Sequence, residues 1–135
     1  MADLPNKISL TIVTRERKII DTQVDEVILP ASDGEVGVLP GHTPLLAMLG
    51  IGQIRYRQGA TLHRLVISWG FAEVLPDRVI VLAERGFLPN EVDRASAEQD
   101  RIAAEKEIAD LSSNDPEFAL AEAKLEESIA KLMLQ

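Results

Sequence analysis

The chain has 135 residues, of which 46% are hydrophobic and 4% aromatic, with no cysteine and a formal net charge of −8. This length suits one core of ordinary size with a small appendage, and the lack of cysteine excludes a disulfide framework and a thiolate metal site. Few aromatic side chains and an acidic balance argue against nucleic-acid binding, which needs stacking rings and clustered basic residues.

The N-terminal stretch MADLPNKISLTIV lacks a basic segment followed by a long apolar run. No window along the chain approaches the roughly 18 consecutive apolar residues that a membrane-spanning helix needs. We therefore expect neither a signal peptide nor a membrane span.

Residues 1–86 have the pattern of short strands separated by turns. Ile8 and Leu10 alternate with polar side chains, as in a strand with one buried face. Asp33 followed by Gly34 is a hairpin signal, because both residues tolerate positive φ. Roughly eight to ten such strands, about 8–12 residues apart, predict a β-sandwich or flattened antiparallel barrel over this segment.

Trp69 is the only tryptophan of the chain and is followed by Gly70 and Phe71. Aromatic side chains bring a large apolar area into a core. We expect Trp69 to fill the interior of the sandwich.

Residues 90–135 have the composition of two helices joined by a short connection. Asn90 is a plausible N-cap for the first helix, and Asp115 followed by Pro116 begins the second. So short a connection predicts an antiparallel helical hairpin. Apolar positions recur at helical spacing in both segments: Val92, Ala95, Ile102 and Ala109 in the first, and Phe118, Ala121, Leu125, Ile129 and Leu132 in the second.

The excess negative charge lies in this last third of the chain. Residues 1–89 contain ten acidic and nine basic side chains, whereas residues 90–135 contain twelve acidic and five basic ones, a net charge of −7. Like-charge repulsion therefore opposes strong binding of the hairpin to acidic surfaces.

The sequence offers no convincing catalytic or metal-binding constellation. The two histidines, His42 and His63, have no other ligands around them at metal-binding spacing. Asp33 and Glu35 share a strand face, as an acid/base pair would, but beside a turn we expect both to be solvated. We predict no catalytic residue, no metal and no cofactor.

The segment SDGEVGVLPGHTPLL, residues 32–46, resembles the hairpin and following corner of the epsilon subunit of bacterial F-type ATP synthases. The resemblance continues in GFAEV at residues 70–74, in VIVLA at residues 79–83 and in the Ala/Glu-rich helical segment, so it covers the chain in order. It implies a β-sandwich followed by a helix pair. It also implies a noncatalytic rotor subunit in the central stalk of a proton- or sodium-translocating ATP synthase, peripheral at the cytoplasmic face of the bacterial plasma membrane.

In this family the sandwich binds the gamma subunit and sits on the membrane-embedded c-ring. The resemblance implies that the apolar residues Leu45, Leu46 and Met48 belong to the core or to the gamma contact. It implies these c-ring or gamma contacts: Asp33, Gly34, Glu35 and His42.

The C-terminal helices of the family reach the alpha and beta subunits and inhibit ATP hydrolysis. The resemblance implies Arg94, Arg101 and Lys106 as their regulatory contacts, and Asp93, Arg94 and Arg101 as nucleotide contacts in members that bind ATP. Those members carry the motif [IL]-D-x-x-R-A, whereas this chain reads VDRASA with Ser96 in place of the arginine. A serine hydroxyl cannot replace a guanidinium group against phosphate, which argues against ATP sensing.

Two other functions remain open from the sequence. A stand-alone β-sandwich that binds a ligand should present exposed aromatic side chains in its loops. A small hydrolase using carboxylates should contain a buried acid with a raised pKa.

Overall fold

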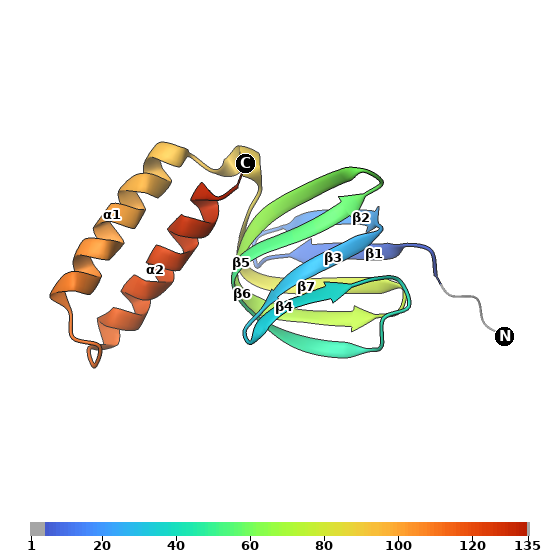
Figure 1. Ribbon diagram of the computed structural model, residues 1–135, viewed down its shortest axis with the longest axis horizontal. Helices are drawn as coiled ribbons and strands as arrows, with labels where there is room; N and C mark the ends of the chain where they lie inside the picture. The colour runs from blue at the N-terminus through green and yellow to red at the C-terminus, as the bar shows by residue number, and fades with distance from the viewer. Residues whose placement is uncertain (1–4, 135) are drawn as a thin grey trace.

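The chain folds into seven strands followed by a helical hairpin (Figure 1). A computed structural model describes residues 5–134, so the predicted boundaries at residues 1 and 135 lie outside the described part. The elements are β1 (Ile8–Val13), β2 (Lys18–Val24), β3 (Glu26–Ala31), β4 (Gly34–Val38), β5 (Leu45–Gln58), β6 (Thr61–Leu75), β7 (Arg78–Phe87), a 3₁₀ turn (Pro89–Glu91), α1 (Arg94–Asp110) and α2 (Pro116–Leu132).

The strands hydrogen-bond in the order β2-β1-β7-β6-β5-β3-β4. Side chains from both ends of this sheet enter one core, for example Leu10 of β1 and Leu29 of β3. The sheet therefore folds over on itself, and the predicted sandwich with a C-terminal helical hairpin is confirmed. One pairing differs from the expected antiparallel pattern, because β1 runs parallel to β7.

The described part contains fewer strands than the eight to ten we expected, because β5 and β6 are long, with 14 and 15 residues. Each of these two strands runs through both layers of the sandwich. In β6, Ile67 and Ala72 both face the core although an odd number of steps separates them, which strict alternation forbids. The change of phase occurs at Trp69 and Gly70, which have φ of 58° and 153°.

Trp69 is not a core residue, contrary to the sequence prediction. Its left-handed backbone conformation turns the indole outward, and the residue is 47% exposed. The next residue must be glycine, because a Cβ atom on Gly70 would lie 2.1 Å from the carbonyl oxygen of Leu82 on β7.

Replacing Gly70 with alanine should lower the free energy of unfolding by about 3 kcal/mol, since β7 must move and a positive φ must be held by a residue with a Cβ atom. Urea unfolding would measure this loss. Gly37→Ala is the matched control, because a Cβ there meets nothing within 4 Å. Equal effects of the two substitutions would contradict the proposed clash.

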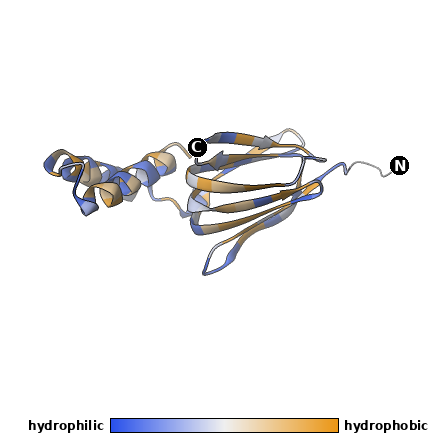
Figure 2. Ribbon diagram, turned by 90° about the horizontal axis from the view of Figure 1, so that it is seen from below, coloured by the Kyte–Doolittle hydropathy of each residue, from blue (hydrophilic) through white to orange (hydrophobic). Residues whose placement is uncertain are grey.

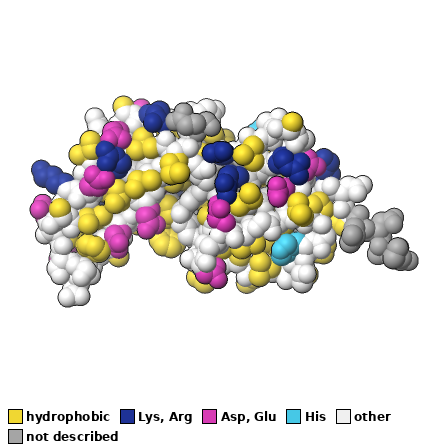
Figure 3. All heavy atoms as spheres, in the orientation of Figure 1, with side chains coloured by type: hydrophobic (Ala, Val, Ile, Leu, Met, Phe, Trp, Pro, Cys, Tyr) yellow, Lys and Arg dark blue, Asp and Glu magenta, His cyan; other side chains and the backbone are white. Residues whose placement is uncertain are grey.

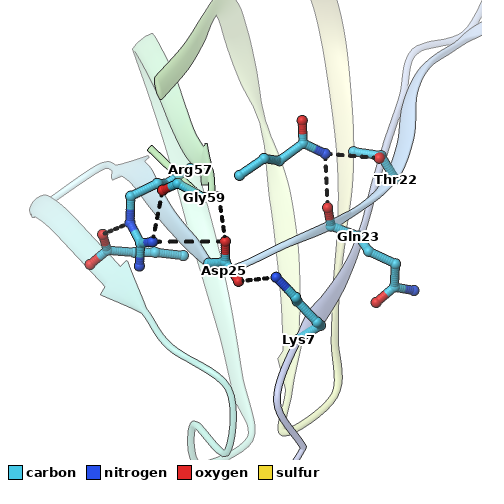
Figure 4. Close-up of polar contacts among 8 residues, drawn as sticks. Lys7, Thr22, Gln23, Asp25, Arg57 and Gly59 are labelled. Carbon is cyan, nitrogen blue, oxygen red and sulfur yellow. Dashed lines mark hydrogen bonds and ion pairs between the residues drawn. The ribbon is translucent and has the colours of Figure 1, made fainter. Parts of the chain in front are cut away.

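A polar network ties together three segments at one end of the sandwich (Figure 4). The Asp25 carboxylate accepts hydrogen bonds from Lys7 Nζ and from the backbone N–H of Gly59, the latter at 2.6 Å. Arg57 Nη1 lies 3.8 Å from the same carboxylate. The bond from Lys7, followed by that from Gly59, holds the pKa of Asp25 below its usual value.

Asp25→Asn should therefore remove a pH-dependent part of the stability. A carboxyl whose pKa is lowered by folding stabilises the fold above its unfolded pKa, near 3.8, and loses that contribution as the pH falls through its folded pKa. The difference in unfolding free energy between wild type and Asp25→Asn should thus shrink below about pH 4. Denaturant titrations at several pH values would measure it, and a difference that stays constant would refute the assignment.

Helix α1 begins later than predicted. Its N-cap is Asp93, whose carboxylate accepts hydrogen bonds from the backbone N–H of Ala95 at 3.1 Å and from Ser96 Oγ at 2.9 Å. Asn90 lies instead within the 3₁₀ turn before the helix. Asp93 is the N-cap because its carboxylate accepts a hydrogen bond from a backbone N–H of the first turn that would otherwise lack a partner.

The buried faces of the two helices also differ from the predicted stripes. In α1, Ala97 and Ala104 are buried while Ile102 is 54% exposed. In α2, Ile129 is 40% exposed and Glu127 is buried. Helix α2 packs against both α1 and the sandwich, so its buried surface is wider than one stripe and includes polar residues.

Candidate functional site

A row of apolar side chains crosses the outer face of β5, β6 and β7. Met48 is the register partner of Phe71, and Phe71 is the partner of Leu82. These three residues are 63%, 49% and 56% exposed. Large apolar side chains clustered on a surface in this way are typical of interaction sites for proteins, membranes or ligands.

Two neighbouring residues extend this row into a larger surface. Trp69 lines a hollow of about 280 Å³ together with the row, and Leu46 lines a second hollow of about 160 Å³ beside Phe71 and Leu82. We call Leu46, Met48, Trp69, Phe71 and Leu82 the apolar face. Because Leu46 and Met48 are exposed, they do not belong to the core, which was one of the two roles predicted for them.

The sequence pointed to only part of this surface. The orientation of Phe71 is hidden because the phase of β6 changes at Trp69. That of Leu82 is hidden because β7 reads VIVLA at residues 79–83, a continuous apolar run without alternation. The sequence signal that could have revealed the change of phase is the pair Trp69 and Gly70, since a glycine inside a strand often marks an irregular backbone.

The predicted acidic hairpin exists and is exposed. Ser32 and Asp33 form the turn between β3 and β4, and Gly34 follows with φ of 134°. Glu35 points toward β5, where Arg55 Nη2 donates to its carboxylate at 2.6 Å. The turn therefore presents the exposed carboxylate of Asp33 beside the carboxylate of Glu35, which is paired with Arg55.

His42 does not lie near this turn. It follows β4 at the opposite end of the strand, and five residues at about 3.3 Å each separate the two ends by about 16 Å. Its Nδ1 atom lies 2.7 Å from the carbonyl oxygen of Thr43. The backbone N–H of Gly41 beside it donates to the carbonyl oxygen of Pro76 at 2.7 Å, which fixes this loop on the β6–β7 turn.

The basic residues predicted as helix contacts are largely engaged within the hairpin. Arg94 Nη1 donates to the carbonyl oxygen of Leu132 at 2.8 Å. Arg101 pairs with Glu98 and, at 2.7 Å, with Glu105. Hydrogen bonds from these carboxylates, Glu98 first, raise the pKa of Arg101 above its ordinary value. Lys106 is exposed.

A cavity of about 280 Å³ lies between the two helices and β7. Its charged lining is balanced, with three acidic and three basic side chains: Asp100, Glu107, Glu127, Arg85, Lys124 and Lys131. The predicted nucleotide contacts Asp93, Arg94 and Arg101 do not line it, and the first two are engaged in capping and in the Leu132 contact.

The second histidine, His63, has a structural role. His63 stacks on Tyr56 with ring centroids 4.8 Å apart, and burial raises the pKa of Tyr56. Within residues 5–134, no group of three or more His, Asp or Glu residues is placed to hold a metal ion. Neither described helix is long and apolar enough to cross a membrane.

The chain is similar to known proteins over nearly its whole length. Residues 7–89 match the family model described as ATP synthase, Delta/Epsilon chain, beta-sandwich domain. An ATP synthase epsilon chain from Syntrophobacter fumaroxidans is 42% identical over 129 residues, 96% of each chain. Another from Herpetosiphon aurantiacus is 40% identical over 93% of this chain and 95% of its own.

The fold also matches a solved structure. A chain in the cryo-EM structure of the Euglena gracilis mitochondrial ATP synthase, which contains OSCP, F1 and the c-ring, superposes with a TM-score of 0.82. The match covers 96% of this chain and 81% of the other at 24% sequence identity. It therefore supports the arrangement of sandwich and helical hairpin.

Proposed function

Because the chain belongs to the ATP synthase epsilon-chain family, we propose that it is a noncatalytic rotor subunit that joins the gamma subunit to the c-ring. The sandwich supplies a continuous rigid core, which suits a part that must transmit torque without deforming. Such a subunit lies at the cytoplasmic face of the bacterial plasma membrane through its partners.

The apolar face is the observation that supports a gamma contact most directly. Its side chains come from adjacent strands of a rigid sheet, so they form a fixed surface that a partner helix or strand can cover. Each fully covered side chain contributes about 1.5–3 kcal/mol. We assign gamma to this face.

The β3–β4 turn suits the polar loops of the c-ring. Asp33 is exposed at its tip, and the pair between Glu35 and Arg55 holds the strand after it in place. His42 lies at the other end of β4, so we assign it to a separate contact of the rotor. This refines the expectation that the four residues of the sequence prediction act together.

The two alternative functions have weaker support. A hydrolase needs a carboxyl with a raised pKa, whereas cationic and backbone donors lower the pKa values of Asp25, Glu91 and Glu98. A loop-based ligand site needs aromatic side chains in loops, whereas Trp69 and Phe71 lie within a strand.

Phe71→Glu should weaken binding to the gamma subunit by about 100-fold, because it forces a charge into an apolar interface. Its thermal unfolding should remain close to that of wild type, since Phe71 is half exposed in the free chain. Co-purification and a binding titration with gamma would measure the effect. Leu62→Glu is the control, because Leu62 is 48% exposed on the same strand but outside the apolar face. Undiminished binding of Phe71→Glu would exclude this face.

We further propose that the helical hairpin inhibits ATP hydrolysis weakly. Its net charge is −7, and its residues Arg94 and Arg101 already have partners, so little positive charge is left for acidic parts of the alpha and beta subunits. The cavity beside α1 likewise lacks the residues predicted to hold ATP.

Deleting residues 90–135 should therefore leave the ATPase rate of the assembled complex nearly unchanged. The rate would be measured with full-length and truncated chains in otherwise identical complexes, after confirming equal incorporation. A severalfold rise in the rate on deletion would show that the hairpin is a strong inhibitor after all.

A further inference from the structure

The apolar contact between the helical hairpin and the sandwich is small. Its buried cluster consists of Val66, Ala130 and Leu134, with Phe87 and Val92 packed beside it. Figure 2 shows the hairpin extending away from one end of the sandwich instead of covering a face of it. Figure 3 shows apolar side chains exposed along the hairpin on the face drawn. Among the described residues of the hairpin, Ile129 is 40% exposed and Met133 is 62% exposed.

The side-chain polar contacts between the two helices and the strands converge on one side chain, and the ion pair of Arg17 with Glu91, at 2.6 Å, ties only the 3₁₀ turn before α1 to the sandwich. Ser68 Oγ of β6 donates to Glu127 Oε2 at 2.8 Å, and Arg85 Nη2 of β7 lies 3.1 Å from Glu127 Oε1. Within residues 5–134, these are the only side-chain hydrogen bond and ion pair that join α1 or α2 to a strand. Glu127 is 9% exposed and Ser68 is 3% exposed.

Glu127 also neutralises a second cation, from its own helix. Lys131 Nζ lies 3.1 Å from Glu127 Oε1. Both cations contact the ring of Phe87 on β7, with Arg85 Cζ 5.1 Å and Lys131 Nζ 3.9 Å from its centroid. The carboxylate and the aromatic ring therefore hold two like charges together that would otherwise repel each other.

The partners on the sandwich are positioned before the helix docks. Ser68 and Arg85 are cross-strand partners in the β6–β7 ladder, and Val66 and Phe87 are partners two residues further along, on the same face. These four side chains thus form a fixed receptor on a rigid sheet, and α2 contributes Glu127. A buried carboxylate accepts its hydrogen bonds in only one position of the helix, so this contact also fixes where α2 sits.

We propose that Glu127 is the residue that holds the helical hairpin docked on the sandwich. Ser68, Arg85, Glu127 and Lys131 form what we call the Glu127 cluster. Loss of the carboxylate removes the tie from α2 to Arg85, whose side chain is 58% exposed, and leaves Lys131, whose side chain is 16% exposed, without its anion. The buried apolar cluster that remains is too small to keep α2 in place. The hairpin then leaves the sandwich while the sandwich stays folded, because Glu127 lies outside its core.

Distance measurements between two spin labels in the full-length chain would test this. The chain has no cysteine, so Thr61→Cys on the sandwich and Asn114→Cys at the tip of the hairpin give one defined pair of exposed labels. Wild type should show one narrow distance. Glu127→Gln should add a second, broad population, with the ratio of docked to detached hairpin at least tenfold lower.

Glu126→Gln is the matched control, because it removes the same charge from the neighbouring exposed position. It should keep the single narrow distance. Glu127→Gln giving the same distribution as Glu126→Gln would overturn the proposal. Circular dichroism of each variant would verify that the sandwich and helices remain folded.

A double-substitution cycle separates this role from a general packing effect. Arg85→Gln and Glu127→Gln remove the same ion pair, so the second substitution should add little to the first. Together they should lower the docked ratio much less than the product of their separate effects. Fully multiplicative effects would mean that the two residues act independently, and would also overturn the proposal.

Discussion

Strand β6 must change, midway along its length, which of its faces points to the core. Before the change, Val66 and Ser68 point outward and lie beneath helix α2. After it, Phe71 points outward and forms part of the apolar face. The left-handed conformation at Trp69, with its close approach of Gly70 to β7, brings about this change. One backbone irregularity thus separates the surface for the hairpin from the apolar face that we propose as the gamma contact.

The sandwich is held together by a much larger buried core than the contact that holds the hairpin on the sandwich. The sandwich has one continuous core, to which all seven strands contribute. The hairpin segment meets it through two buried apolar side chains, Ala130 and Leu134, which pack with Val66 of β6, and through one buried carboxylate, Glu127. The rotor role that we propose for the sandwich is compatible with a hairpin that detaches, since a contact this small is opened at low cost in free energy. The acidic charge of residues 90–135 meets cations of the sandwich at Glu127, which pairs with Arg85, and at Glu91, which pairs with Arg17.

Local patterns of the candidate site could be predicted, but their combination could not. The dipeptide Asp33-Gly34 predicted a hairpin turn, and a turn does join β3 to β4, but it is formed by Ser32 and Asp33, and of the predicted pair only Gly34 has positive φ. His42 is only nine residues away, yet β4 lies between the two and puts them at opposite ends. Met48 was a candidate for a gamma contact, but its partners Phe71 and Leu82 come from strands far along the chain. Proximity across strands depends on register, which no single segment encodes.

The sequence by itself determined a β-sandwich followed by a helical hairpin, because alternation and helical spacing are properties of short segments. It also determined the family, through motifs spread along the chain. Only the tertiary structure decided which way Trp69 points, which face of α1 is buried and that Glu127 lies in the interior. The reason is physical: each of these depends on the surface opposite the residue, and that surface is formed by strands and helices that the chain brings together only when it folds.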